Sequence, residues 1–260
     1  MVLTVAMDRI IAVIPDIPMK TATTASMMIQ GKETMMENKA KKPLELYIHV
    51  PFCVKKCDYC DFLSGPAGKE RQAEYFQALQ REVASVPDFP DREITTVFIG
   101  GGTPSVPDPA LIGAVLDQIR NKFFMAPDAE ITIEANPGTL YKEKLEDYLE
   151  HGVNRLSLGL QSPQNRELKI LGRIHTWEEF LESFSLAREA GFSNINIDLM
   201  SAIPDQTYED WKKNLCTVAA LGPEHISAYS LIVEEGTPFW ERELDLPDED
   251  TENRMYEDTA

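Results

Sequence analysis

Positive charge is scarce in this sequence of 260 residues, which has 25 lysines and arginines against 43 aspartates and glutamates. The formal net charge of −18 argues against a general affinity for nucleic acid or for anionic membrane surfaces. We therefore expect no nucleic acid among the partners of this chain and no integral membrane segment in it.

Long apolar runs are missing from the beginning of the chain. The longest run there, from Ile10 to Ile14, is closed by Pro15 and is far shorter than the ~20 residues of a membrane-spanning helix. No secretory cleavage site follows it. We interpret residues 1–43 as a flexible leader, or as translation begun upstream of a natural start at Met35 or Met36. A weak targeting peptide is the alternative.

Cysteine is rare as well, with four in the whole chain. So few cysteines do not form the disulfide framework of a small secreted protein, and they suit a reducing cytoplasm. Three of them, Cys53, Cys57 and Cys60, fall within eight positions, so we expect all three to take part in one site. Thiolates suit iron–sulfur clusters and zinc, and both remain open from spacing alone. Cys216, beside Leu215 in an amphipathic pattern, is predicted to be a small buried apolar residue.

Strand-like and helix-like patterns alternate from Leu46 onward. Helical spacing of apolar residues covers Glu70 to Val86 and Pro109 to Phe124. Thr176 with Glu179 and Thr207 with Asp210 have the spacing of capping boxes at helix starts, and Gly152, Gly191 and Gly222 mark helix ends. The apolar strand-like runs are Leu46 to Val50, Thr95 to Ile99, Ile131 to Ala135, Arg155 to Leu160, Asn194 to Met200 and Ile226 to Leu231. This alternation predicts an α/β fold with a parallel sheet, either a barrel or a doubly wound open sheet.

Polar and glycine residues follow the ends of these strands. The cysteine loop follows the first strand, Gly100 to Pro104 follows the second, and Glu134 closes the third. Gln161 closes the fourth strand and Asp198 lies near the end of the fifth. Because the carboxyl ends of parallel strands share one edge, all these groups should meet at one rim, where α/β proteins bind ligands. The glycine run lacks the P-loop and dinucleotide-binding spacings.

These spaced motifs resemble the radical S-adenosylmethionine (SAM) superfamily, and within it the oxygen-independent coproporphyrinogen III oxidase group with its heme-chaperone branch. The resemblance runs from about Leu44 to Trp240. It is carried by Tyr47 to Cys53, the three cysteines, Gly100 to Pro104, Glu134 to Pro137, Arg155 to Gln161 and Asn196 to Met200.

The resemblance implies a partial (β/α)6 barrel and two cofactors. Cys53, Cys57 and Cys60 would ligate a [4Fe–4S] cluster, and SAM would chelate the iron that has no cysteine. The residues that would contact SAM are Tyr47, Gly101, Gly102, Thr103, Glu134, Gln161, Arg173 and Asp198. Residues 44–240 would form the radical SAM core, and residues 241–260 the acidic start of a C-terminal region. Members of the group usually continue into a helix-rich C-terminal domain, where heme chaperones carry a His-Asn-x-x-Tyr-Trp motif that these 260 residues do not contain. We interpret the sequence as truncated or partial, or as one whose heme-handling part is lost, with a short natural variant as the alternative.

Position 62 separates the two branches of the group. The oxidases typically carry a further cysteine two residues after the third one, whereas this sequence has Phe62 there, as the chaperones usually do. The resemblance therefore implies a heme chaperone that delivers heme to respiratory proteins. The alternative is an oxidase that cleaves SAM reductively and decarboxylates porphyrinogen propionates.

Overall fold

The structure is a computed structural model that describes residues 5–6, 9–12 and 41–259. It places two short strands, β1 (Val5–Ala6) and β2 (Arg9–Ala12), within the segment predicted to be a leader. The remainder of that segment before residue 41 lies outside the described residues, so the leader stays a prediction.

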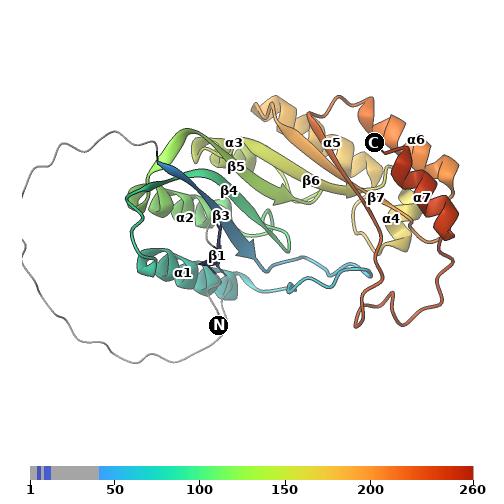
Figure 1. Ribbon diagram of the computed structural model, residues 1–260, viewed down its shortest axis with the longest axis horizontal. Coiled ribbons are helices and arrows are strands. Elements are labelled where there is room, and N and C mark those ends of the chain that lie inside the picture. Colours follow the sequence, from blue (N-terminus) through green and yellow to red (C-terminus); the bar gives the residue numbers. More distant parts are fainter. Residues whose placement is uncertain (1–4, 7–8, 13–40, 260) are drawn as a thin grey trace, which may run out of the picture.

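One sheet organises the chain (Figure 1). Its parallel strands are β3 (Lys42–Val50), β4 (Arg92–Gly101), β5 (Met125–Ala135), β6 (Arg155–Gln161), β7 (Ile195–Ser201) and β8 (His225–Ser230). Each strand pairs with the next one in the sequence, while β2 adds in parallel to β3 and β1 in antiparallel to β2.

The strand order decides between the two architectures that the sequence pattern left open. A doubly wound sheet reverses its strand order at a switch point, whereas this order runs without reversal from β3 to β8. Within the described part of the chain β8 pairs only with β7, so the curled sheet does not close. The predicted partial barrel of the radical SAM type is therefore confirmed.

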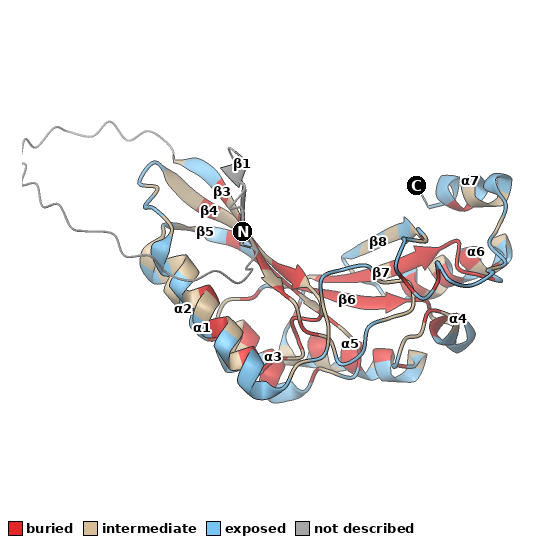
Figure 2. Cartoon of the chain, turned by 90° about the horizontal axis from the view of Figure 1, so that it is seen from below, coloured by how far each residue is buried: buried red, intermediate tan, exposed pale blue. Residues whose placement is uncertain are grey.

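The connecting helices follow one another along one side of the curled sheet (Figures 1 and 2). They are α1 (Lys69–Ser85), α2 (Pro109–Lys122), α3 (Lys142–Glu150), α4 (Asn165–Ile170), α5 (Trp177–Ala190) and α6 (Tyr208–Ala219). A last helix, α7 (Glu249–Glu257), contacts α6, where the indole of Trp211 donates to the carbonyl of Met255 at 3.0 Å.

Burial explains why these strands read as nearly continuous apolar runs. Strand β6 buries every residue from Leu156 to Gln161, and β7 buries all of its residues except Asp198. The predicted helix faces also pack inward, with Phe76 and Leu79 of α1 buried against the sheet. Figure 2 shows this core between the strands and the inner sides of the helices.

The helix boundaries follow local sequence rules. Thr176 and Thr207 both form complete capping boxes, so each threonine accepts from the third helical residue, whose carboxylate accepts from the threonine N–H. The three predicted terminal glycines all have positive φ angles, 75° for Gly152, 116° for Gly191 and 67° for Gly222.

The prediction for Cys216 was wrong. This residue is exposed on α6, whereas the buried residues of that helix are Trp211, Asn214 and Val218. Each helical residue is rotated by about 100° from the next. Cys216 is two positions from both Asn214 and Val218, so its side chain lies on the opposite side of the helix from them.

Among the described residues, no helix combines the length and the apolar character that crossing a membrane requires.

Candidate functional site

A cavity of about 450 Å³ opens at the carboxyl ends of the strands. It brings together almost all the residues that the sequence singled out, namely Cys53, Cys57, Cys60, Gly101, Gly102, Thr103, Glu134, Gln161, Arg173 and Asp198. The expected gathering at one rim is therefore observed, although the role of each residue remains a prediction.

Tyr47 is the exception. Its ring stacks against Phe98 at a centroid distance of 6.1 Å and lines a different cavity, formed by residues of β3, β4 and β5. Burial, together with the nearby charge of Glu134, raises the pKa of the Tyr47 phenol to about 12. The structure therefore places Tyr47 beside the site but not in its wall.

The cysteine loop leaves β3 and is held at both ends by backbone hydrogen bonds. The N–H of Cys53 donates to the carbonyl of Gly65 at 3.1 Å, and the N–H of Asp58 donates to that of Leu171 at 3.2 Å. All three thiols are free and partly buried. Burial raises the pKa of the Cys60 thiol above its ordinary value. The loop therefore presents three thiols from a fixed backbone.

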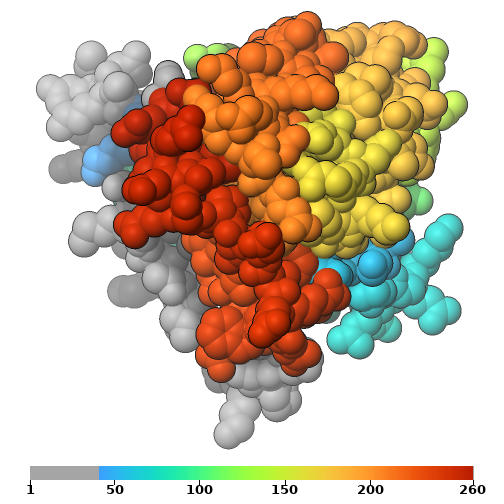
Figure 3. All heavy atoms as spheres, turned by 90° about the vertical axis from the view of Figure 1, so that its right-hand side faces the viewer, coloured from blue at the N-terminus to red at the C-terminus, as the bar shows by residue number. Residues whose placement is uncertain are grey.

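The segment after β8 also holds the cysteine loop (Figure 3). The N–H of Phe239 donates to the Asp58 carbonyl at 3.0 Å, and the Arg242 guanidinium forms a 2.9 Å ion pair with the Asp58 carboxylate. These contacts bring residues nearly two hundred positions apart to one side of the cavity.

The glycine run packs against the cysteine loop. The N–H of Gly102 donates to the carbonyl of Val50 at 2.8 Å, and that of Thr103 donates to Phe52 at 2.7 Å. A Cβ atom on Gly102 would lie 2.8 Å from the carbonyl oxygen of Phe52, which is backbone and cannot turn aside. Gly101 has a φ of 112°, a region that side chains disfavour. Glycine is thus required for the close approach of the two loops.

Hydrogen bonds connect two of the cysteines to side chains on other loops, the one after β4 and the one after α4. The Thr103 hydroxyl donates to Sγ of Cys53 at 3.5 Å, and Nη1 of Arg173 donates to Sγ of Cys57 at 3.5 Å. Asn136 lies between these donors, 2.9 Å from Thr103 and 2.7 Å from Arg173. Asn136 was part of a motif in the sequence but received no role there, because its partner Arg173 lies 37 residues further along the chain.

Two carboxyl groups line the cavity from β5 and β7, the strands on either side of β6. Burial, with the charge of Asp198 nearby, raises the pKa of Glu134 to about 7. Burial also raises the pKa of Asp198 to about 6, although hydrogen bonds from Asn196 at 2.7 Å and Ser157 at 3.3 Å oppose the shift. The Gly101 N–H donates to Glu134 at 3.1 Å. Near neutral pH, a cationic or hydroxyl-bearing ligand would stabilise the charged forms of both groups.

Gln161 ends β6 in a left-handed conformation, with a φ of 74°. Its side-chain oxygen accepts a hydrogen bond from the hydroxyl of Tyr229 on β8. Burial raises the pKa of this tyrosine well above its ordinary value, so it is a neutral donor. Tyr229 was not predicted from the sequence as a site residue, because it lies within an apolar run that was interpreted only as a strand.

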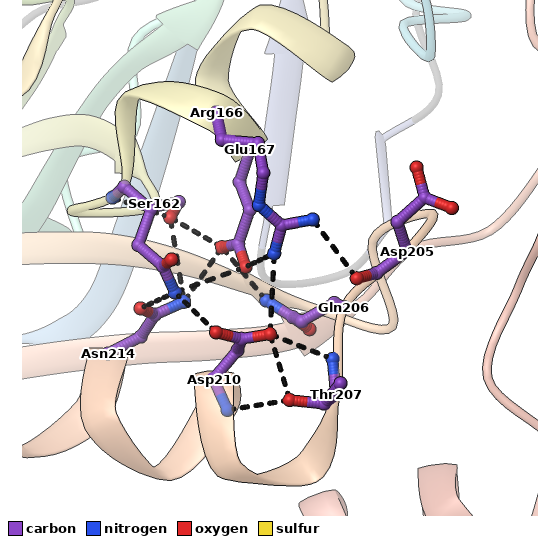
Figure 4. Close-up of polar contacts among 9 residues, drawn as sticks. Ser162, Arg166, Glu167, Asp205, Gln206, Thr207, Asp210 and Asn214 are labelled. Atoms are coloured by element: carbon purple, nitrogen blue, oxygen red, sulfur yellow. Dashed lines mark hydrogen bonds and ion pairs between the residues drawn. The ribbon is translucent and has the colours of Figure 1, made fainter.

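A network of polar side chains lies behind this end of the sheet (Figure 4). The fully buried carboxyl group of Glu167 accepts hydrogen bonds from Ser162 at 2.6 Å and Asn214 at 2.8 Å, and from Gln206 at 3.1 Å and Gln164 at 3.2 Å. The network therefore joins the loop after Gln161 to α4, α6 and the loop after β7.

The donor set has the chemistry of an iron–sulfur site, because three free and partly buried thiols line one cavity and thiolates are the usual protein ligands of such clusters. The buried Nε of Arg173 has no hydrogen-bond partner, so this wall of the cavity can still donate to an acidic ligand.

Comparisons with known proteins agree with this site. Residues 47–215 match the family described as the radical SAM superfamily. The chain is 43% identical over 210 residues to the heme chaperone HemW of Escherichia coli, covering 80% of this chain and 56% of that protein. It is 39% identical over 217 residues to HemW of Bacillus subtilis, covering 81% and 57%. The chain therefore spans a little over half the length of the curated relatives it matches.

A solved structure is similar as well. It is the coproporphyrinogen III oxidase HemN of Escherichia coli, described as a radical SAM enzyme, and it aligns with a TM-score of 0.76 and 30% identity. The alignment covers 85% of this chain and 52% of the oxidase. The similarity to the oxidase group and to its heme-chaperone branch, predicted from the motifs, is thus confirmed. From the match over most of its length, the chain belongs to the radical SAM superfamily.

Proposed function

We propose that this chain binds a [4Fe–4S] cluster through Cys53, Cys57 and Cys60, and binds SAM beside it, as the core of a heme-chaperone-like protein. The observation that carries the proposal is the presence of three free thiols and two carboxyl groups around one cavity. When bound, the cluster supplies an electron and one iron that no cysteine holds, where the amino and carboxylate groups of SAM can coordinate.

The chain's own residues would position SAM. Gly101, Gly102 and Thr103 would line its methionine part, because the glycines leave room for close approach. Arg173 would donate to its carboxylate, since Nε is free and guanidinium groups form strong charge-assisted bonds.

Further polar residues would receive the rest of SAM. Glu134 and Asp198 would accept from its ammonium or ribose hydroxyl groups, which would return both carboxyls to their charged forms. Gln161 would add an amide at the same wall of the cavity. Tyr47, which is close enough to Glu134 for that charge to raise the pKa of its phenol, would lie near the cluster and SAM.

Heme is the proposed cargo, and a respiratory protein its proposed acceptor. The relatives of this chain carry the name heme chaperone, and Phe62 stands where oxidases of the group typically have a further cysteine. Phe62 is 62% exposed at the wall of the cavity, where an apolar ring can contact a flat apolar ligand. Three thiols that must stay reduced suit a cytoplasmic location.

Coproporphyrinogen oxidation is the second candidate function. It is favoured by the similarity of fold to the oxidase, with a TM-score of 0.76 and 30% identity. A radical reaction needs a cavity from which water is excluded, and the described cavity has mainly carbon-rich walls, including Phe62, Leu231 and Ile232.

One experiment separates the two candidates. The full chain is purified without oxygen and reconstituted with iron and sulfide. Heme is then titrated into one sample, and coproporphyrinogen and SAM are added to another. The control is a chain with all three cysteines changed to alanine, which separates heme absorption from cluster absorption. Stoichiometric heme binding without porphyrin product supports the chaperone. Repeated product formation would overturn it, and so would the absence of both activities.

A further inference from the structure

Among the hydrogen bonds of residues 41–259 described above, only those of Asn136 connect the side chain that donates to Cys53 with the side chain that donates to Cys57. Its Nδ2 lies 2.9 Å from Oγ1 of Thr103, which contacts Cys53, and its Oδ1 lies 2.7 Å from Nη2 of Arg173, which contacts Cys57. A single amide thus touches both side chains that donate toward the predicted cluster ligands.

The chemistry of these groups fixes the direction of every bond. Arginine has only donors, so the amide oxygen of Asn136 must face Arg173 and the NH₂ group must face Thr103. The oxygen of Thr103 then accepts from Asn136, and its single proton is left to point at Sγ of Cys53. The amide therefore turns the threonine proton toward the sulfur.

Two hydroxyl side chains hold the backbone of Asn136 in this position. Its N–H donates to the Ser105 hydroxyl at 3.3 Å, and its carbonyl accepts from the Thr139 hydroxyl at 2.7 Å. Gly159 leaves the space that the amide needs, because a Cβ atom there would lie 2.6 Å from Oδ1 of Asn136. The Gly159 carbonyl also accepts from Nη2 of Arg173 at 2.5 Å. The bridge thus joins the loops after β4, β5 and α4 to β6, and it is not a chance surface contact.

We propose that Asn136 is a positioning residue that sets the reduction potential of the cluster by orienting the Thr103 and Arg173 donors toward Cys53 and Cys57. Hydrogen bonds to cluster sulfurs stabilise the reduced, more negative state and raise the potential. The inference rests on the proposed function, because it requires the three cysteines to hold an iron–sulfur cluster. It assigns residues that adjust the reduction potential of the cluster, whereas the proposed function assigns the residues that bind it.

The test is the midpoint potential of the reconstituted cluster, measured without SAM by redox titration followed by electron paramagnetic resonance. Asn136→Asp keeps the shape of the side chain but removes its donor, so the Thr103 proton turns from the sulfur to the new carboxylate. The added charge also competes with Cys57 for Arg173. We expect the equilibrium constant for one-electron reduction to fall about tenfold, which is ~59 mV toward negative potential.

A charge-matched control is Asn154→Asp. Asn154 directly precedes β6 and so lies at the end of that strand that is away from the cavity. Its amide donates to the Ala129 carbonyl at 2.9 Å. The same charge change there should leave the potential as in the wild type. An intact cluster with equal potentials in Asn136→Asp and Asn154→Asp would overturn the inference.

A second pair of variants tests the inference if the Asn136→Asp chain does not assemble a cluster. Thr103→Val removes the hydroxyl and should lower the potential, whereas Thr103→Ser keeps it and should preserve the potential. In the Thr103→Val background, Asn136→Asp should have a smaller effect, because no threonine proton remains to be turned. An unchanged potential in Thr103→Val would contradict the inference. Failure of the wild type to assemble any cluster would instead contradict the proposed function itself.

Discussion

At the scale of single residues, the four cysteines are chemically alike but differently placed. Cys57 lies in the wall of the cavity, where Arg173 donates to its sulfur, whereas Cys216 is exposed on α6. We predict that Cys57→Ala removes most of the bound iron and the visible absorption of thiolate-ligated iron after anaerobic reconstitution. The reason is that loss of one of three thiolates leaves an iron without a protein ligand.

Cys216→Ala is the matched control for this prediction. It removes the same atoms from a site that touches neither the cavity nor the cysteine loop. Iron content and spectrum should match those of the wild type. Equal iron content and equal spectra in Cys57→Ala and Cys216→Ala would contradict the assignment of Cys57 as a ligand.

The residues that could be predicted from the sequence are those whose chemistry is local. Three closely spaced cysteines, a run of glycines and a carboxylate at the end of an apolar strand each carry a signal within a few positions. Asn136 and Tyr229 do not, because each is defined by a partner far away in the sequence, Arg173 and Gln161. Tyr47 shows the reverse limit, since its place in a motif did not reveal that its ring lines a neighbouring cavity with Phe98 and not the cavity of the three cysteines.

At the scale of elements, the capping boxes and the terminal glycines fixed where helices begin and end, and the structure agrees with them. The order of the strands could not be read in the same way, because an alternation of strand and helix is common to barrels and open sheets. Contacts between elements could not be predicted either, because the alternation of strands and helices does not say which elements lie side by side. Glu167, in a short helix, became notable only once it was seen to join α4 to α6 (Figure 4).

We predict that Glu167→Gln destabilises the chain by roughly 2–3 kcal/mol. The carboxyl group accepts from four side chains, and an amide of the same shape replaces one oxygen by an NH₂ group that must face another donor. Buried donors left without an acceptor lose hydrogen bonds that they make with water in the unfolded chain. Urea denaturation followed by circular dichroism measures the effect.

Glu182→Gln on α5 is the control for this substitution. Glu182 is exposed, so the same chemical change should alter the free energy of unfolding by less than about 0.5 kcal/mol. If both variants unfold at the same urea concentration as the wild type, the buried network does not join the two helices as strongly as its hydrogen bonds indicate.

At the scale of the whole molecule, the parallel sheet places Glu134 of β5 and Asp198 of β7 in one buried site. Both carboxyls have pKa values above their ordinary range, about 7 for Glu134 and about 6 for Asp198, because burial disfavours their charged forms. The folded chain therefore binds these two protons more tightly than the unfolded chain does. Its stability must rise as the pH falls through 7 and 6, and this contribution must be lost as the pH rises again.

We predict that the cofactor-free chain is more stable at pH 5.5 than at pH 8 by about 2 kcal/mol from these two groups. The double variant Glu134→Gln/Asp198→Asn has no proton to gain at either site, so its stability should lose this part of the pH dependence. Urea denaturation at both pH values, with the thiols kept reduced, measures the difference. Glu182→Gln again serves as control and should keep the pH dependence of the wild type. The same dependence in the double variant would show that the two carboxyls are not held in a buried site. Adding SAM to the reconstituted protein should also reduce the dependence, because a bound ammonium or hydroxyl group would stabilise the charged carboxylates at pH 8.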